Sequence, residues 1–202
     1  MNLPTWPTKI RLKAGAGIIV ALCVCTSCST PEQPQVVKTE KAFASGGNAE
    51  LTLDGGNYTI RSAASDTIRV SFSGNAGNAT ADLTANGTQA KLVVKDTPHN
   101  FQSTIEVPAT TDLVLHLAAG NLEIAPITGS KDIESKAGNV QIAVGNADDY
   151  LSVDASVGVG NLDGGPFGDS GSGPSHHLTW AGHGKYTLRL SLGAGNLELH
   201  AK

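Results

Sequence analysis

The sequence predicts an all-β domain, built as a β-solenoid-like stack of short strands. Apolar and polar residues alternate with period two in 68–72, 113–117 and 186–192, which is typical of strands with one buried and one solvated face. No window combines helical spacing with capping residues, so almost no helix is expected. The 24 glycines and only 4% aromatic residues favour a core of Val, Leu, Ile and Ala with many glycine corners.

The second observation behind this fold is a Gly-Asn step followed by apolar, polar and apolar residues. Glycine takes positive φ without strain, and asparagine tolerates left-handed conformations better than most residues. Each step therefore predicts a corner between two strands. The clear copies lie in 119–124, 137–142, 159–163 and 194–199, with weaker copies in 46–51 and 55–60. The predicted corner residues are Gly120, Asn121, Gly138, Asn139, Gly160, Asn161, Gly195 and Asn196.

The spacing of the corners is the third observation. Gly120 and Gly138 are 18 residues apart and Gly138 and Gly160 are 22 apart, intervals that suit one coil stacking on the previous one. Stacked coils would align the asparagines in a ladder of side-chain amides. The interval from Gly160 to Gly195 is 35 residues and contains a Gly/Ser/His-rich stretch, 163–177, which is loop-like by composition. This irregular spacing leaves an antiparallel β-sandwich as the alternative architecture.

The first 27 residues resemble an export signal rather than part of the fold. Lys9, Arg11 and Lys13 precede an uncharged, mostly apolar run, 14–24, which is far shorter than the ~20 residues of a spanning helix. Residues 1–27 are therefore predicted to be a signal peptide, residues 28–42 a tether containing Pro31 and Pro34, and residues 43–202 the β domain.

The end of this signal resembles that of bacterial lipoproteins, because Thr26 and Ser27 are small residues directly before Cys28. The resemblance implies a diacylglyceryl thioether on Cys28, and Ser29 in place of an aspartate implies retention in an outer membrane. The position three before Cys28 is Cys25 instead of the expected leucine. Cys25 as the acceptor would place Leu22 there, but it would put the bulky Val24 at the cleavage point. The alternative is ordinary cleavage and a soluble periplasmic or secreted product.

Net charge limits the partners of the domain. The whole chain carries −4; with three bases in the signal, the chain after residue 27 holds 11 bases against 18 acids, a net charge of −7. Nucleic-acid binding needs a basic stripe, and the sequence has none. An acidic surface also disfavours docking on anionic lipid, so contact with the membrane is expected through the covalent anchor.

Candidate chemistry is sparse. His176, His177 and His183 lie close in sequence and are the weak candidates for a metal site, but their spacing fits no standard signature, so no metal and no cofactor is predicted. Asp148, Asp149, Asp154 and Asp163 could suggest a glycan-cleaving enzyme, which needs two carboxyls across a cleft. Turn and surface positions explain these acids better, and a non-enzymatic protein is expected.

The strings VPATTDLVLHLAAGNLEI (107–124), AGNVQI (137–142) and GKYTLRLSLGAGNLEL (184–199) resemble the bacterial putative-adhesin domain family, a domain of unknown function with repeated Gly-Asn/Asp-Leu/Ile/Val motifs. The resemblance covers roughly 45–200. It implies a right-handed β-solenoid-like fold and provides no catalytic residues.

Three functions follow as hypotheses. The first is a non-enzymatic cell-envelope lipoprotein whose adhesin-like domain binds an envelope protein or glycan. The second is a structural or sensor spacer that acts through partner proteins. The third and most distant is a glycan-active enzyme, which would require Asp154, Asp163 and a lysine to converge in one groove.

Overall fold

The computed structural model describes residues 36–168 and 170–201. All described residues belong to one compact unit. These residues form thirteen strands and two short 3-10 turns and include no α-helix. The all-β prediction is confirmed.

The alternating segments predicted from the sequence are strands β4, β8 and β13. The bounds of the elements are β1 (Val36–Ala42), β2 (Gly47–Leu53), β3 (Gly56–Ser62), β4 (Thr67–Ser73), β5 (Thr80–Asn86), β6 (Gln89–Lys95), β7 (Gln102–Val107), β8 (Thr111–Leu117), β9 (Gly120–Ile124), β10 (Lys131–Gly145), η1 (Ala147–Asp149), β11 (Tyr150–Asp163), η2 (Gly165–Phe167), β12 (Ser170–Ala181) and β13 (Tyr186–Ala201).

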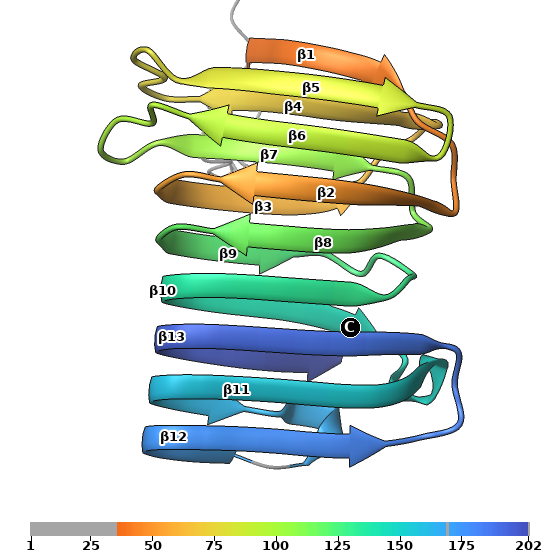
Figure 1. Cartoon of the computed structure of the whole chain (residues 1–202), viewed down its shortest axis with the longest axis vertical. Coiled ribbons are helices and arrows are strands. Elements are labelled where there is room, and N and C mark those ends of the chain that lie inside the picture. The colour runs from red at the N-terminus through yellow and green to blue at the C-terminus, as the bar shows by residue number, and fades with distance from the viewer. Residues whose placement is uncertain (1–35, 169, 202) are drawn as a thin grey trace, which may run out of the picture. The chain divides into compact units, whose positions relative to one another are not determined.

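The strands stack in two layers that meet at the glycine corners (Figure 1). The pre-corner layer contains the strand segments before each corner, and the post-corner layer contains the segments after it. The pre-corner layer runs β5-β6-β2-β8 and continues into the first halves of β10, β13 and β11. The post-corner layer runs β1-β4-β7-β3-β9 and continues into the second halves of the same three strands. Pairing is parallel through the middle of the stack and antiparallel at both ends, where β5, β4, β1 and β12 lie.

We call a pre-corner strand together with the post-corner strand that follows it a rung, for example β8–β9. Parallel pairing in register places similar residues opposite one another in successive rungs. In the pre-corner layer Leu51, Leu115, Ile133, Leu190 and Ala155 form one row, each opposite the next. In the post-corner layer Ile60, Ile124, Ile142 and Leu199 form another. All of these side chains are buried, so the core is a set of aliphatic rows between the two layers. The alternation fixes this register, because a slip by one residue would turn each row to solvent.

Most aromatic residues in the described part of the domain form two clusters, one toward each end of the stack. Phe101 packs edge-on against Tyr58 and Phe72, with ring centroids 5.8 Å and 4.7 Å apart. Near the other end Phe167 contacts Tyr150 at 5.7 Å and Trp180 at 5.0 Å. Large rings thus pack beside the aliphatic rows, which continue past Ile60 to Ile105 and Val70.

The order of the rungs differs from the prediction that each coil stacks on the previous one. β13, the last strand of the chain, lies between β10 and β11, and the β2–β3 rung lies between β6–β7 and β8–β9. Every rung has the same corner and the same alternation, so the pattern sets the register but not which rung is the neighbour.

Two predicted boundaries also change. Val36–Ala42, assigned to the tether, is strand β1 and pairs with β4, so the tether can extend no further than residue 35. The stretch 163–177, predicted as a loop, contains the turn η2 and the first part of β12. Glycine and Pro174 are tolerated there because β12 is an edge strand with only one partner in the described chain, β11.

Candidate binding face

A column of glycines forms the corners. Gly120, Gly138, Gly195 and Gly160 lie opposite one another across neighbouring strands, and all have φ between +126° and +141°. A Cβ built on Gly138 would overlap the carbonyl oxygen of Gly120, and a Cβ on Gly195 would overlap that of Gly138. The corners therefore require glycine twice over, for the backbone conformation and for the close approach of the neighbouring rung.

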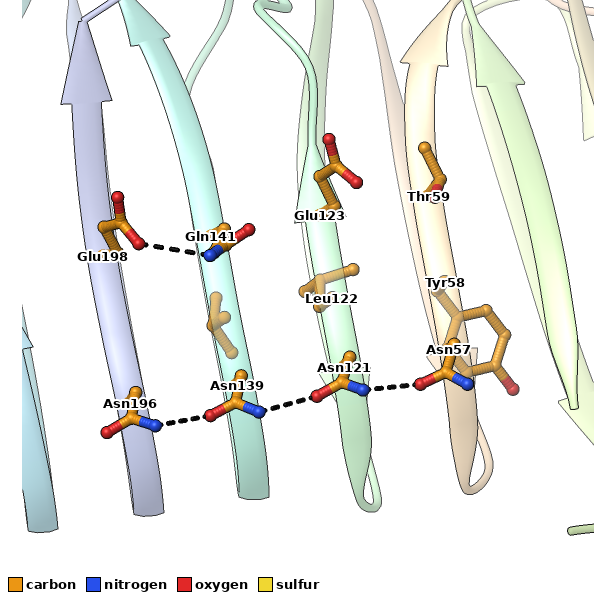
Figure 2. A pocket seen from close by; sticks show the side chains of 11 residues that line it. Asn57, Tyr58, Thr59, Asn121, Leu122, Glu123, Asn139, Gln141, Asn196 and Glu198 are labelled. Atoms are coloured by element: carbon orange, nitrogen blue, oxygen red, sulfur yellow. Dashed lines mark hydrogen bonds between the residues drawn. The ribbon is translucent and has the colours of Figure 1, made fainter. Parts of the chain in front are cut away.

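The asparagine after each glycine joins a ladder of side-chain amides that runs across five strands. Asn161 Nδ2 donates to Asn196 Oδ1 at 2.7 Å, and Asn196 Nδ2 donates to Asn139 Oδ1 at 2.7 Å. Asn139 continues to Asn121 at 2.8 Å, and Asn121 to Asn57 at 2.7 Å. Figure 2 shows four of these five residues in line. All the bonds point the same way, an arrangement in which each bond polarises the next.

Asn57 is the member that the sequence marked only as a weak copy. Its segment reads Gly-Gly-Asn-Tyr, so an aromatic residue replaces the aliphatic one of the clear copies. Tyr58 fills that position and packs against Phe101. The larger side chain thus belongs to the cluster of rings that Tyr58 forms with Phe101 and Phe72.

A second polar row lies two residues beyond the ladder, on the same outward face. It contains Thr59, Glu123, Gln141 and Glu198, and Gln141 Nε2 donates to Glu198 Oε2 at 3.1 Å (Figure 2). The two rows line a shallow groove of about 660 Å³. We call this surface the ladder face: Asn57, Thr59, Asn121, Glu123, Asn139, Gln141, Asn196 and Glu198.

The ladder face can form hydrogen bonds and carries negative charge. An asparagine amide offers two N–H donors and two oxygen lone pairs, and a ladder position inside the row uses one of each for its neighbours. Among the described residues that line the groove, Glu123 and Glu198 are the charged ones. The face is thus suited to a ligand that is neutral or cationic and offers hydroxyl, amide or amine groups.

The three candidate metal-binding histidines do not come together. His176 and His177 are neighbours on β12 and so face opposite sides of the strand, while His183 lies in the turn before β13. His177 Nε2 is 3.1 Å from Asp154 Oδ1 on the outer surface. Within 36–168 and 170–201, no three His, Cys, Asp or Glu residues are grouped so that they could hold a metal ion.

The candidate carboxylates are also separated. Asp148 and Asp149 lie in η1. Asp154 pairs in register with Arg189 in the pre-corner layer, whereas Asp163 pairs with Glu198 in the post-corner layer. Asp163 accepts a bond from the backbone N–H of Gly165 at 3.0 Å, which is the behaviour of a turn residue. The convergence required for a glycan-active site does not occur between these residues.

One buried lysine was not predicted from the sequence. Lys131 is 1% exposed and sits in the apolar row between Leu113 and Leu188. Its Nζ donates to the carbonyl oxygens of Ile127 at 2.7 Å and Gly129 at 3.1 Å, and to Tyr150 Oη at 3.1 Å. Its position in the alternation, two residues before Ile133, was the signal that its side chain points inward.

Burial lowers the pKa of Lys131 to about 8, although Asp112 opposes the change, and burial raises the pKa of Tyr150 to about 12. Between pH 8 and 10.5 the unfolded chain holds a proton on this lysine that the folded chain has released. The lysine therefore contributes a rise in the free energy of unfolding with pH over that range, and the raised pKa of Tyr150 opposes this rise above about pH 10.

The predicted lipid acceptor Cys28 and the alternative Cys25 lie outside the described residues. No helix in the described part of the chain is long and apolar enough to cross a membrane.

The corners, the ladder and the stacked rungs define an all-β protein built from glycine-asparagine repeats. No family model matches the chain, and a search of curated proteins finds no match. Among solved structures, the chain is similar to a putative cell adhesion protein from Clostridium sporogenes, with a TM-score of 0.53 and 12% identity over 84% of this chain and 100% of that one. At this identity the likeness shows a shared fold.

Proposed function

We propose that this chain is an exported, lipid-anchored envelope protein that binds an envelope protein or glycan through the ladder face, without catalysing a reaction. The observation that carries the proposal is the ladder face itself, a continuous polar surface on four neighbouring strands with spare hydrogen-bonding groups at regular spacing. Neighbouring strands lie about 4.8 Å apart. A linear ligand laid across them would meet an amide at each step.

The open shape of the groove supports contact with a long or flat partner. Sites for small molecules enclose most of their ligand, whereas this groove is shallow and no aromatic ring is exposed in it. Its two carboxylates disfavour an anionic ligand such as a nucleic acid. The name of the structural neighbour, a cell adhesion protein, is consistent with this role.

The architecture belongs to the same proposal. We interpret the stack as a variant of a β-solenoid of the putative-adhesin type, in which parallel rungs turn at aligned Gly-Asn corners. The register of Gly120, Gly138, Gly195 and Gly160 supports this interpretation over a sandwich of antiparallel strands.

The anchor would be the diacylglyceryl group on Cys28, which supplies two acyl chains, enough for stable attachment. Val36 follows Cys28 by eight positions, so the lipid would lie within about 28 Å of the start of β1.

The experiment compares binding of the wild-type chain with that of a Glu123→Lys/Glu198→Lys variant, on an array of neutral and amino-sugar glycans and on detergent-extracted envelope proteins. The matched control is Asp132→Lys/Glu134→Lys, which makes the same charge change on exposed positions of the pre-corner layer. We expect the ladder-face variant to lose at least tenfold in affinity and the control to bind like the wild type. Equal loss in both variants would contradict the assignment of the face. Failure of the wild type to bind any of these components would favour the structural spacer.

A further inference from the structure

Strand β12 ends the stack, and its outer edge has no partner strand in the described chain. Its hydrogen-bonded neighbour is β11, and β12 lies at the opposite end of the stack from β1 (Figure 1). An open edge presents a row of free backbone N–H and C=O groups, which can pair with another strand. Proteins usually block such an edge with charges, proline or irregular backbone.

The strands at the other end carry these blocking features. β1 contains Lys38, Glu40 and Lys41, and β5 contains Asp82. β12 has no Lys, Arg, Asp or Glu anywhere between Ser170 and Ala181. Its first half is blocked differently, by Pro174 and by the positive φ of Ser175, +58°. The second half, residues 176–181, has neither proline nor a formally charged side chain at neutral pH and remains a regular, open edge.

We propose that residues 176–181 pair antiparallel with the same segment of a second copy of this chain, about a two-fold axis that passes beside Thr179. Such pairing continues the sheet from one copy into the other. The inward-facing Leu178 of each copy would lie opposite Trp180 of the other, and the two copies of Thr179 would face each other on the outer surface. Apolar–aromatic and Thr–Thr pairs across antiparallel strands are favourable.

The composition of the segment is what selects a second copy as the occupant. A two-fold pairing places each residue against its own neighbours, so a strand with several like charges would repel itself, whereas 176–181 brings no formal charges together. A single patch that serves both copies is the usual form of a homodimer interface. Burial agrees, since Leu178 is 3% exposed and packs in the core while Thr179 is exposed, so the outward row of the edge is accessible to a second copy.

The contact is expected to be weak in dilute solution. A stable dimer buries about 1,600 Å² in total, more than a six-residue edge supplies. Confinement to a membrane raises the effective concentration of the copies, so the pairing becomes substantial on the membrane that the proposed lipid anchor provides. In this respect the inference rests on the proposed function.

The test is disulfide cross-linking of the full chain carrying Thr179→Cys, in its native membrane fraction. Two residues directly opposite in an antiparallel pair have Cα atoms about 4.5–5.5 Å apart, within the range of a disulfide. The matched control is Thr52→Cys, an exposed threonine on β2 in the middle of the stack. We expect at least ten times more dimer, at twice the mass of the chain, from Thr179→Cys than from the control.

A second measurement uses two differently tagged copies and their co-purification after brief amine cross-linking. Thr179→Asp, which opposes two carboxylates across the axis, should reduce co-purification at least fivefold, while Thr52→Asp should not. Equal cross-linking of the two cysteine variants, or a Thr179→Cys product whose mass shows a different protein, would overturn the proposal.

Failure of the anchor is distinguishable from failure of the edge. If the chain is recovered without lipid in the soluble fraction, the proposed function is wrong, and the same cross-linking is then done at about 1 mM chain. Dimers specific to position 179 would still support the edge pairing, and their absence would overturn it.

Discussion

Removal of one amide from the middle of the asparagine ladder should cost about twice as much stability as removal of an amide from its end. Asn139 donates to Asn121 and accepts from Asn196, whereas Asn161 only donates, to Asn196. A net hydrogen bond contributes about 0.5–1.5 kcal/mol, and exposed amides lie near the lower part of that range. Asn139→Ala should thus lower the free energy of unfolding by about 1.5–2 kcal/mol, and Asn161→Ala by about 0.7–1 kcal/mol.

The assay is urea unfolding of both variants and of the wild type, followed by circular dichroism, with Asn57→Ala as a second end position. Asn and Ala both have low strand propensity, so the comparison isolates the ladder bonds. Equal losses at the middle and end positions would refute the additive account of the ladder. A larger loss than the sum of two end positions would show that the bonds reinforce one another along the row.

Three further predictions concern the corner and the buried polar groups. Gly138→Ala should lower the free energy of unfolding by at least about 3 kcal/mol, because the new methyl group overlaps the Gly120 carbonyl and the backbone at this position is left-handed. Urea unfolding tests this, and a loss below about 1 kcal/mol would contradict the assigned corner. Release of the Lys131 proton should raise stability by about 2 kcal/mol between pH 8 and pH 10. Lys131→Met should flatten that rise, and a fall between pH 8 and pH 9.5 in the wild type would oppose the account. Ser135→Ala should stabilise the domain by about 1 kcal/mol, since Ser135 Oγ is buried without a hydrogen-bond partner in the described structure, and a thermal melt that shifts downward would contradict it.

The alternating and Gly-Asn patterns predict the strands and the ladder because each is a local requirement. The two-residue period in 113–117 and 186–192 determines which side chains are buried, and the corner glycines need no information from outside their own rung and the next. The weak copy at 55–60 is part of the same ladder, so the motif tolerates Tyr58 in place of an aliphatic residue where Phe101 packs against it.

The neighbours of each rung could not be predicted in the same way. β13 can pair with β10 or with any rung of the same pattern, and the choice depends on how the β11–β12 hairpin leaves space beside β10. The composition of 163–177 predicted a loop, but part of this stretch is strand. Gly, Ser and Pro are compatible with an edge strand that has one partner. Lys131 shows the converse, because its charge suggests the surface while its place in the period indicates the core.

The anchor is the most direct point at which to test the account, and the measurement is the intact mass of the protein purified from its native membrane fraction, with a Cys28→Ala control. A mature chain that begins at Cys28 and carries the added mass of a diacylglyceryl group, absent in the control, is the predicted result. An unmodified chain that begins near Ser29 or Thr30 and is found in the soluble fraction would contradict the account.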